Sequence, residues 1–308
     1  ALLTRTAHLQ CLSASSPFWA GADTGYADNR AMMFQQLPTA GAPEQFSTWE
    51  QLESYTGDLV HTGVIEDFTE IRWDVRPSPR LGTIEVRACD AATNLTELAG
   101  MAALTQCLVE SFSRTLDRGE ELDALPDWYV AENKWRSARY GMDAILIVNS
   151  AGEEELVGDT VEQMLTELAP VAEDLGCAAE LDSVRTTLET GASYQRQIAA
   201  VRAYGGQREA AVRLLLAEAR AGRLGAASRQ AVRLEWQSTQ AQLLAGVALA
   251  QQLPWRLAAE LRFIIAGGQR ILDRIAHADY DSVAHRPVLG WRDGPALLRL
   301  ALFPRRQA

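Results

Sequence analysis

Carboxylates and guanidiniums alternate with apolar side chains in the stretch EIRWDVRPSPRLGTIEVRACD, which fills residues 70–90. A period of two on either side of a Pro-Ser-Pro-Arg-Leu-Gly turn is typical of a β-hairpin whose two faces differ. The polar face of this hairpin holds Arg72, Asp74, Arg76, Glu85 and Arg87, and the apolar face includes Ile84. Such a polar face is either the solvated side of an antiparallel sheet or a surface that binds a metal through carboxylates and phosphate through arginines. The residues by themselves leave both interpretations open.

Three further segments bring charged side chains or paired glycines together. DTGYADNR puts Asp23 and Arg30 in a Gly-containing loop, and NKWRSARYG puts Arg136 and Arg139 on one helical face. AGGQR carries two glycines before Arg270. Each segment also has an ordinary structural interpretation, namely a turn, a solvated arginine pair and close helix packing.

The residue types restrict the chemistry that these segments can perform. Residues 1–222 hold one lysine, Lys134, and 16 arginines, which argues against Schiff-base chemistry and makes arginine the expected phosphate ligand. The sequence contains no Gly-x-Ser-x-Gly elbow, no Walker loop and no dinucleotide-binding fingerprint. Its histidines lack metal-ligand spacing, so a zinc site is not expected. The cysteines form no Cys-x-x-Cys pair and predict buried thiols of a cytoplasmic protein; they are Cys11, Cys89, Cys107 and Cys177.

The elements that must position these side chains are mostly helical. Apolar residues at three- and four-residue spacing predict ten helices. They cover residues 1–14, 48–65, 95–116, 126–140, 159–175, 179–190, 193–204, 207–221, 226–252 and 254–277. No strand is predicted beyond residue 90. We therefore expect an α+β fold, with a hairpin at residues 70–90, a helical remainder and an all-α C-terminal segment.

Composition and charge predict two soluble domains. The 308 residues are 47% hydrophobic and 22% charged, and no apolar run reaches the roughly 18 residues that a membrane span needs. Residues 1–222 hold 17 basic and 34 acidic residues, a net charge of −17. Residues 223–308 hold 12 basic and 6 acidic residues, a net charge of +6. This asymmetry predicts a junction near Gly222 and argues against nucleic acid as a partner.

Several of these segments resemble one known family. LSASSPFWAGADTGYADNR, the Pro-containing loop after it, IRWDVRPSPRLGTIEVRACD and NKWRSARYG occur in this order. Together they closely resemble the carboxylate–amine ligase branch of the glutamate–cysteine ligase family over about residues 9–221. The resemblance implies an ATP-dependent ligase that activates the side-chain carboxylate of glutamate as an acyl phosphate, which an amine, usually that of cysteine, then attacks. ATP and Mg²⁺ are the cofactors that it implies.

The same resemblance implies roles for five residues and makes the polar face of the hairpin part of the floor of an active site. Glu85 matches a Mg²⁺ ligand, and Arg87, on the same face, matches a nucleotide-phosphate contact. Arg30 matches the loop arginine that meets the acidic substrate or the acyl phosphate. Arg76 and Arg139 match recurrent anion contacts, which we group with the catalytic and the nucleotide-binding residues respectively.

One part of the family pattern is absent from this sequence. Family members begin with a segment that holds a GIELE-like strand, further acidic metal ligands and a histidine-bearing strand. By this resemblance, residues 1–222 are expected to be a portion truncated at its N-terminus, with an incomplete antiparallel sheet around the hairpin and weak or no activity by itself. The unpaired strand edges of such a portion would favour a homo-oligomer.

The tail resembles a second family. LPWRLAAELRFIIAGGQRILDRIAHADYDSVAHRPVLGWRD resembles the last helices of squalene and phytoene synthases, so residues 223–308 are expected to be a helical segment of that kind, mainly over 226–303. The aspartate-rich motifs that bind diphosphate in those enzymes are absent from the sequence. The alternatives to a ligase are thus a non-catalytic fusion or scaffold of two partial domains, and an isoprenoid-synthase relative.

Overall fold

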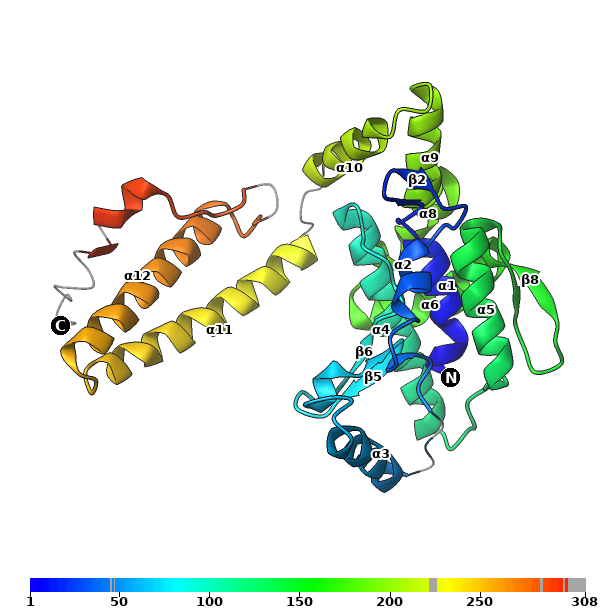
Figure 1. Ribbon diagram of the computed structural model, residues 1–308, viewed down its shortest axis with the longest axis horizontal. Coiled ribbons are helices and arrows are strands. Elements are labelled where there is room, and N and C mark those ends of the chain that lie inside the picture. Colours follow the sequence, from blue (N-terminus) through cyan, green and yellow to red (C-terminus); the bar gives the residue numbers. More distant parts are fainter. Residues whose placement is uncertain (45, 47, 222–225, 283–284, 296, 299–308) are drawn as a thin grey trace. The chain divides into compact units, whose positions relative to one another are not determined.

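The computed structural model of the chain describes residues 1–44, 46, 48–221, 226–282, 285–295 and 297–298 (Figure 1). The chain divides into two compact units, Ala1–Ala219 and Arg220–Ala308. Gly222, the predicted junction, lies outside the described residues, as do residues 299–303 of the tail. Both units are mainly helical, and the small sheets lie in the first, so the α+β fold with an all-helical C-terminal part is confirmed.

The core of the first unit forms where four helices meet (Figure 1). The helix α1 (Leu2–Ser13) packs against α5 (Asp127–Tyr140) and α4 (Leu95–Asp117), and α4 packs against α6 (Val157–Leu175). The apolar cluster itself is formed mainly by side chains of α1, α4 and α6, because burial of apolar surface is the main force that holds packed helices together. Among the side chains that are at most 1% exposed in this core are Leu9, Cys11, Leu104, Leu146, Val161 and Leu165.

Local sequence signals set the ends of these helices. Asn94 caps α4, because its Oδ1 accepts the amide N–H of Glu97 at 2.9 Å, as the sequence predicts. The helix α5 begins directly after Pro126 and ends before Gly141, whose φ is +57°. Gly176 ends α6 in the left-handed conformation that glycine adopts without strain.

Shorter helices surround this core. They are α2 (Asn29–Phe34), α3 (Trp49–His61), α7 (Ala178–Asp182), α8 (Val184–Thr190), α9 (Ser193–Ala203) and α10 (Glu209–Ala221), with 3₁₀ turns at Phe68–Glu70 and Gly141–Asp143. The predicted helix at residues 179–190 is divided at Ser183 into α7 and α8. The six-residue α2 was not predicted, because it is too short to show a helical period.

Four two-stranded ladders complete the first unit. The pairs β1–β2, β5–β6 and β7–β8 are antiparallel, whereas β3–β4 is parallel. Their strands are β1 (Phe18–Trp19), β2 (Ala22–Asp23), β3 (Ala40–Gly41), β4 (Arg72–Trp73), β5 (Val75–Ser78), β6 (Thr83–Val86), β7 (Ile145–Ile147) and β8 (Glu154–Leu156).

The structure corrects the prediction that no strand lies beyond residue 90. Strands β7 and β8 lie there, and neither has the alternation of polar and apolar residues that predicts a strand. The predicted hairpin is also shorter than residues 70–90. Its paired residues run only from Val75 to Val86, because Arg72 and Trp73 pair with β3 instead. Ile84, on the predicted apolar face, is 53% exposed.

The second unit is a helical hairpin. The helices α11 (Ala226–Ala250) and α12 (Trp255–His277) pack along each other, and a 3₁₀ turn (Trp291–Asp293) follows. A Cβ at Gly268 would lie 2.8 Å from Cδ1 of Leu243, so this glycine of AGGQR allows close helix packing, as its ordinary interpretation predicts. No helix in the described parts of the chain combines the length with the apolarity that a membrane span needs.

The core of the first unit should depend strongly on Leu104. This side chain is 0% exposed, and the Leu104→Ala variant should lower the free energy of unfolding of the first unit by about 2–5 kcal/mol, because it leaves a cavity. Leu116 lies on the same helix and is 57% exposed, so Leu116→Ala should change the same free energy by less than about 0.5 kcal/mol. Urea denaturation of the two variants measures both values. Equal losses would contradict the assignment of the core.

Candidate active site

Glu85 joins two arginines on the polar face of the β5–β6 hairpin. Its Oε2 accepts from Nη2 of Arg76 at 2.6 Å, and its Oε1 accepts from Nη1 of Arg87 at 2.6 Å. The antiparallel register places Glu85 opposite Arg76, and Arg87 follows two residues later on the same face. The hydrogen bond from Arg76, with that from Arg87, holds the pKa of Glu85 below its usual value. Glu85 therefore stays ionised and orients both guanidiniums.

Arg76 uses its donors inside the protein. Besides Glu85, its Nη1 donates to the backbone carbonyls of Thr69 and Ile71, both at 2.6 Å. Arg76 is only 8% exposed, so its guanidinium is buried. The hydrogen bonds to Glu85, Thr69 and Ile71 leave it fully paired. Arg76 therefore links the hairpin to the turn at residues 68–71 by hydrogen bonds.

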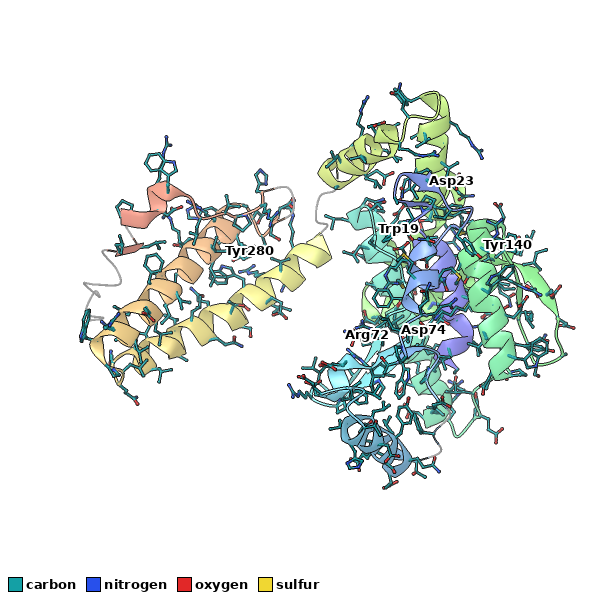
Figure 2. All side chains as sticks on the ribbon, viewed as in Figure 1. Trp19, Asp23, Arg72, Asp74, Tyr140 and Tyr280 are labelled. Carbon is teal, nitrogen blue, oxygen red and sulfur yellow. The ribbon has the colours of Figure 1, made fainter. Side chains whose placement is uncertain are left out.

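Arg87 lines a small cavity with three other cations. Arg30 from α2, Arg72 from β4 and Lys134 from α5 surround a space of about 20 Å³, and Asp74 lies on the same wall. Nζ of Lys134 contacts both carboxylate oxygens of Asp74, at 2.9 and 2.7 Å. Figure 2 shows the positions of Arg72 and Asp74 beside the hairpin.

The loop before α2 holds Arg30 in place. The Oγ of Ser16 accepts the amide N–H of Arg30 at 3.0 Å and contacts Oδ2 of Asp90 at 2.5 Å. The guanidinium of Arg30 lies over the ring of Phe34, 4.6 Å from its centroid. The backbone of Arg30 is thus held by Ser16, and Arg30 lines the same cavity as Arg87.

A buried carboxylate underlies the same loop. Asp28 is 0% exposed, and its Oδ1 accepts the amide N–H of Ala31 at 2.9 Å, which caps α2. Its Oδ2 has no hydrogen-bond partner in the described part of the chain. Burial, with the nearby charge of Asp90, raises the pKa of Asp28 to about 6.

Arg139 lies apart from this cavity. Its guanidinium sits between the rings of Tyr26 and Tyr140, at 5.2 and 5.9 Å from their centroids. A Cβ at Gly25 would lie 2.8 Å from Nη1 of Arg139, and Gly25 has φ +71°, so only glycine leaves room there. Tyr140 and the Asp23 loop are labelled in Figure 2. The neighbouring Arg136 is paired with acids, as expected for a surface arginine.

The cavity residues fit an anion better than a metal. Within the described residues, no group of three or more His, Cys, Asp or Glu side chains could hold a metal ion. Both oxygens of Glu85 are bound by guanidiniums, whose charges oppose a cation. Guanidiniums and an ammonium are the groups that suit phosphate and carboxylate oxygens. The role of Glu85 as a Mg²⁺ ligand stays a prediction.

The tertiary structure thus brings together some of the residues that the sequence singles out and adds others. Arg30 and Arg87 share the cavity, Glu85 and Arg76 support Arg87 from behind, and Arg139 is elsewhere. Three residues of the cavity were given no individual role by the sequence analysis, namely Arg72, Asp74 and Lys134. Their signals were visible, since two belong to the alternating face and the third is the only lysine of the chain.

The buried Asp28 should make stability depend on pH. Its folded-state pKa of about 6 exceeds the usual 3.8, so between pH 4 and 6 the folded form keeps a proton that the unfolded form loses. This term lowers the free energy of unfolding as the pH rises through that window, by roughly 3 kcal/mol in total at about 1.4 kcal/mol per pKa unit. The Asp28→Asn variant keeps the capping oxygen and has no such proton.

Denaturation of wild type and Asp28→Asn at several pH values measures this effect. The difference in unfolding free energy should shift in favour of the variant by about 3 kcal/mol from pH 4 to pH 7. Asp23→Asn is the control, because Asp23 lies in the same loop and is exposed. A difference that stays constant with pH for Asp28→Asn would refute the buried, protonated carboxylate.

Comparison with known proteins identifies the family of the chain. The sequence model of Glutamate-cysteine ligase family 2 (GCS2) matches residues 2–227. A relative from Leifsonia xyli subsp. xyli, named "Putative glutamate--cysteine ligase 2", is 55% identical over 221 residues, which are 72% of this chain and 58% of that protein. Its namesake from Mycobacterium tuberculosis (strain ATCC 25177 / H37Ra) is 52% identical over 217 residues, 70% of this chain and 58% of the relative. The chain spans a little under three fifths of these relatives and belongs to glutamate–cysteine ligase family 2.

Proposed function

We propose that this chain is the part of an ATP-dependent carboxylate–amine ligase that binds the reacting anionic groups. Membership of glutamate–cysteine ligase family 2 supports the reaction type. The observation that carries the proposal is the convergence of Arg30, Arg72, Arg87 and Lys134 on one cavity. These cations gather in a part of the chain whose net charge is −17, so they are not part of a generally basic surface.

The proposed reaction explains why cations are needed. ATP supplies the phosphoryl group, which the side-chain carboxylate of glutamate accepts to form an acyl phosphate and ADP. An amine, that of cysteine or another amino compound, then attacks the acyl carbon and forms the amide as inorganic phosphate leaves. Negative charge is concentrated on the transferring group in the first step and on the leaving phosphate in the second. Guanidiniums held in fixed positions stabilise the negative charge in both steps.

Each predicted site residue has a role in this proposal. Arg87, oriented by Glu85, contacts a phosphate oxygen, and Arg30, oriented by the Ser16 loop, contacts the acidic substrate or its acyl phosphate. Arg76 acts through Glu85 and is a positioning residue. Arg139 offers a second anion contact beside the Gly25 loop.

We also propose a cytoplasmic location. The four cysteines are free, although Sγ of Cys107 and Sγ of Cys177 are 3.7 Å apart. Unlinked thiols so close together suit a reducing compartment.

The alternative is a non-catalytic role for this chain. Its support is that, within the described residues, no group of three or more His, Cys, Asp or Glu side chains could hold a metal ion. Weak or absent activity of the chain by itself stays a prediction. The two candidate functions differ in their response to nucleotide.

The ligase proposal predicts that ATP with Mg²⁺ and glutamate raises the melting temperature of the chain. A ligand at one hundred times its dissociation constant stabilises by about 2.7 kcal/mol, which amounts to a shift of several degrees for a unit of this size. Arg87→Ala should abolish most of the shift. Arg80→Ala should leave it unchanged, because Arg80 is an exposed arginine in the turn of the same hairpin.

Glutamate-dependent release of ADP provides the second measurement. The ligase proposal expects ADP release that rises with glutamate and falls sharply in Arg87→Ala. If the chain shows no thermal shift at millimolar nucleotide and no glutamate-dependent ADP release, the non-catalytic role is the better description.

A further inference from the structure

We propose that the cavity formed by Arg30, Arg72, Arg87 and Lys134 binds one terminal oxyanion, a carboxylate or a phosphoryl group, of an acidic small molecule. Arg72 and Lys134 are its recognition residues, and Asp74 positions Lys134. The inference deepens the proposed ligase function, because it assigns a ligand class and three further residues to the same site, but it concerns binding and is tested without turnover.

The first support is an excess of positive charge. Four cations and one carboxylate line the cavity, so its net charge is 4 − 1 = +3. Glu85, behind Arg87, is also paired with Arg76, so these two residues together leave the excess unchanged. Like charges held close together in a partly buried space repel one another, and an anion between them removes the repulsion. A ligand of the opposite charge is therefore the natural occupant.

Arg72 gives the second support. Within the described residues its guanidinium has no hydrogen-bond or ion-pair partner, although it is only partly exposed. Arg87 and Lys134, by contrast, are each oriented by a carboxylate. The planar fork of an arginine suits two oxygens of a carboxylate or phosphate. Arg72 is thus a cation of the cavity whose guanidinium is available for a ligand, as that of Arg30 is apart from a 3.5 Å contact with the carbonyl of Arg87.

The size of the cavity selects the ligand group. A volume of about 20 Å³ holds on the order of one small group, because a single water molecule needs about 10–15 Å³ by the same measure. A whole triphosphate is far larger. The cavity therefore receives the end of a ligand, and the rest of the molecule lies outside it.

Asp74 holds the ammonium group of Lys134 in the wall of the cavity. Its two carboxylate oxygens hold Nζ of Lys134, and the side chains of both residues are mostly buried, with 14% and 16% of their surface exposed. Without Asp74 a flexible lysine would extend into water. The pair keeps the ammonium in the cavity wall, where it meets an arriving anion.

Lys134 allows a direct test, because it is the only lysine of the chain. An acetylating reagent then reacts with two kinds of amine, Nζ of Lys134 and the α-amino group of Ala1, and peptide mass spectrometry separates them. A bound oxyanion covers the ammonium and blocks the approach of the reagent. Inorganic phosphate or glutarate should therefore slow acetylation of Lys134 several-fold and leave Ala1 unchanged, compared with chloride at equal ionic strength.

The two ligands distinguish the two sources of the oxyanion. Stronger protection by phosphate assigns the cavity to a phosphoryl group, and stronger protection by glutarate, a dicarboxylate without an amine, assigns it to a substrate carboxylate. Either result supports the inference. If neither ligand slows the acetylation of Lys134 more than chloride does, the inference is wrong.

Two arginine variants provide the matched comparison. Arg72→Gln should raise the ligand concentration for half-protection of Lys134 by about tenfold or more, the loss expected when one charged donor is removed. Arg80→Gln should leave this concentration unchanged. Circular dichroism confirms that both variants are folded. Wild-type protection in folded Arg72→Gln would overturn the role of Arg72.

The result separates this inference from the proposed function. Protection of Lys134 without glutamate-dependent ADP release supports the oxyanion cavity and argues against a ligase. ADP release without protection supports the ligase and refutes the oxyanion cavity.

Discussion

Electrostatic repulsion among neighbouring cations is the constraint on which the candidate site depends. Four basic side chains share a cavity of about 20 Å³, and the fold holds them there by placing an acid behind two of them. Glu85 orients Arg87, and Asp74 orients Lys134. These acids lower the electrostatic free energy of keeping the cations close together. Arg72 has no such acidic partner among the described residues, so its charge can interact with a ligand.

The helical core fixes the positions of these charged side chains. The helix α5 carries Lys134 on one side, and near its end the carbonyl of Ala138 accepts the amide N–H groups of Ala27 and Asp28 at 2.9 and 3.0 Å. One rigid element therefore holds both a cavity residue and the loop that presents Arg30. Burial of Asp28 with one unpartnered oxygen is unfavourable for stability. That cost falls at the loop beside the proposed site, where strain and buried charge often accompany function.

The described residues of the site suit anionic groups better than metal ions. The described residues supply cations for anionic groups, whereas acidic groups able to hold a metal are not found among them. The compared relatives are longer than the region that the chain matches. The second unit, with 12 basic and 6 acidic residues in 223–308, has a different charge character. Its likeness to the end of a squalene or phytoene synthase stays a prediction.

The sequence by itself determined the long helices, their caps at Asn94 and Gly176, the α+β class and the family. These features depend on side chains a few residues apart, or on strings of residues that can be compared directly. The strands β7 and β8 and the cavity needed the tertiary structure. Asp74 and Lys134 are 60 residues apart, and they meet only because the fold brings α5 next to the residue between β4 and β5. A contact between distant segments has no local period in the sequence, so packing alone decided which of the many arginines share a site.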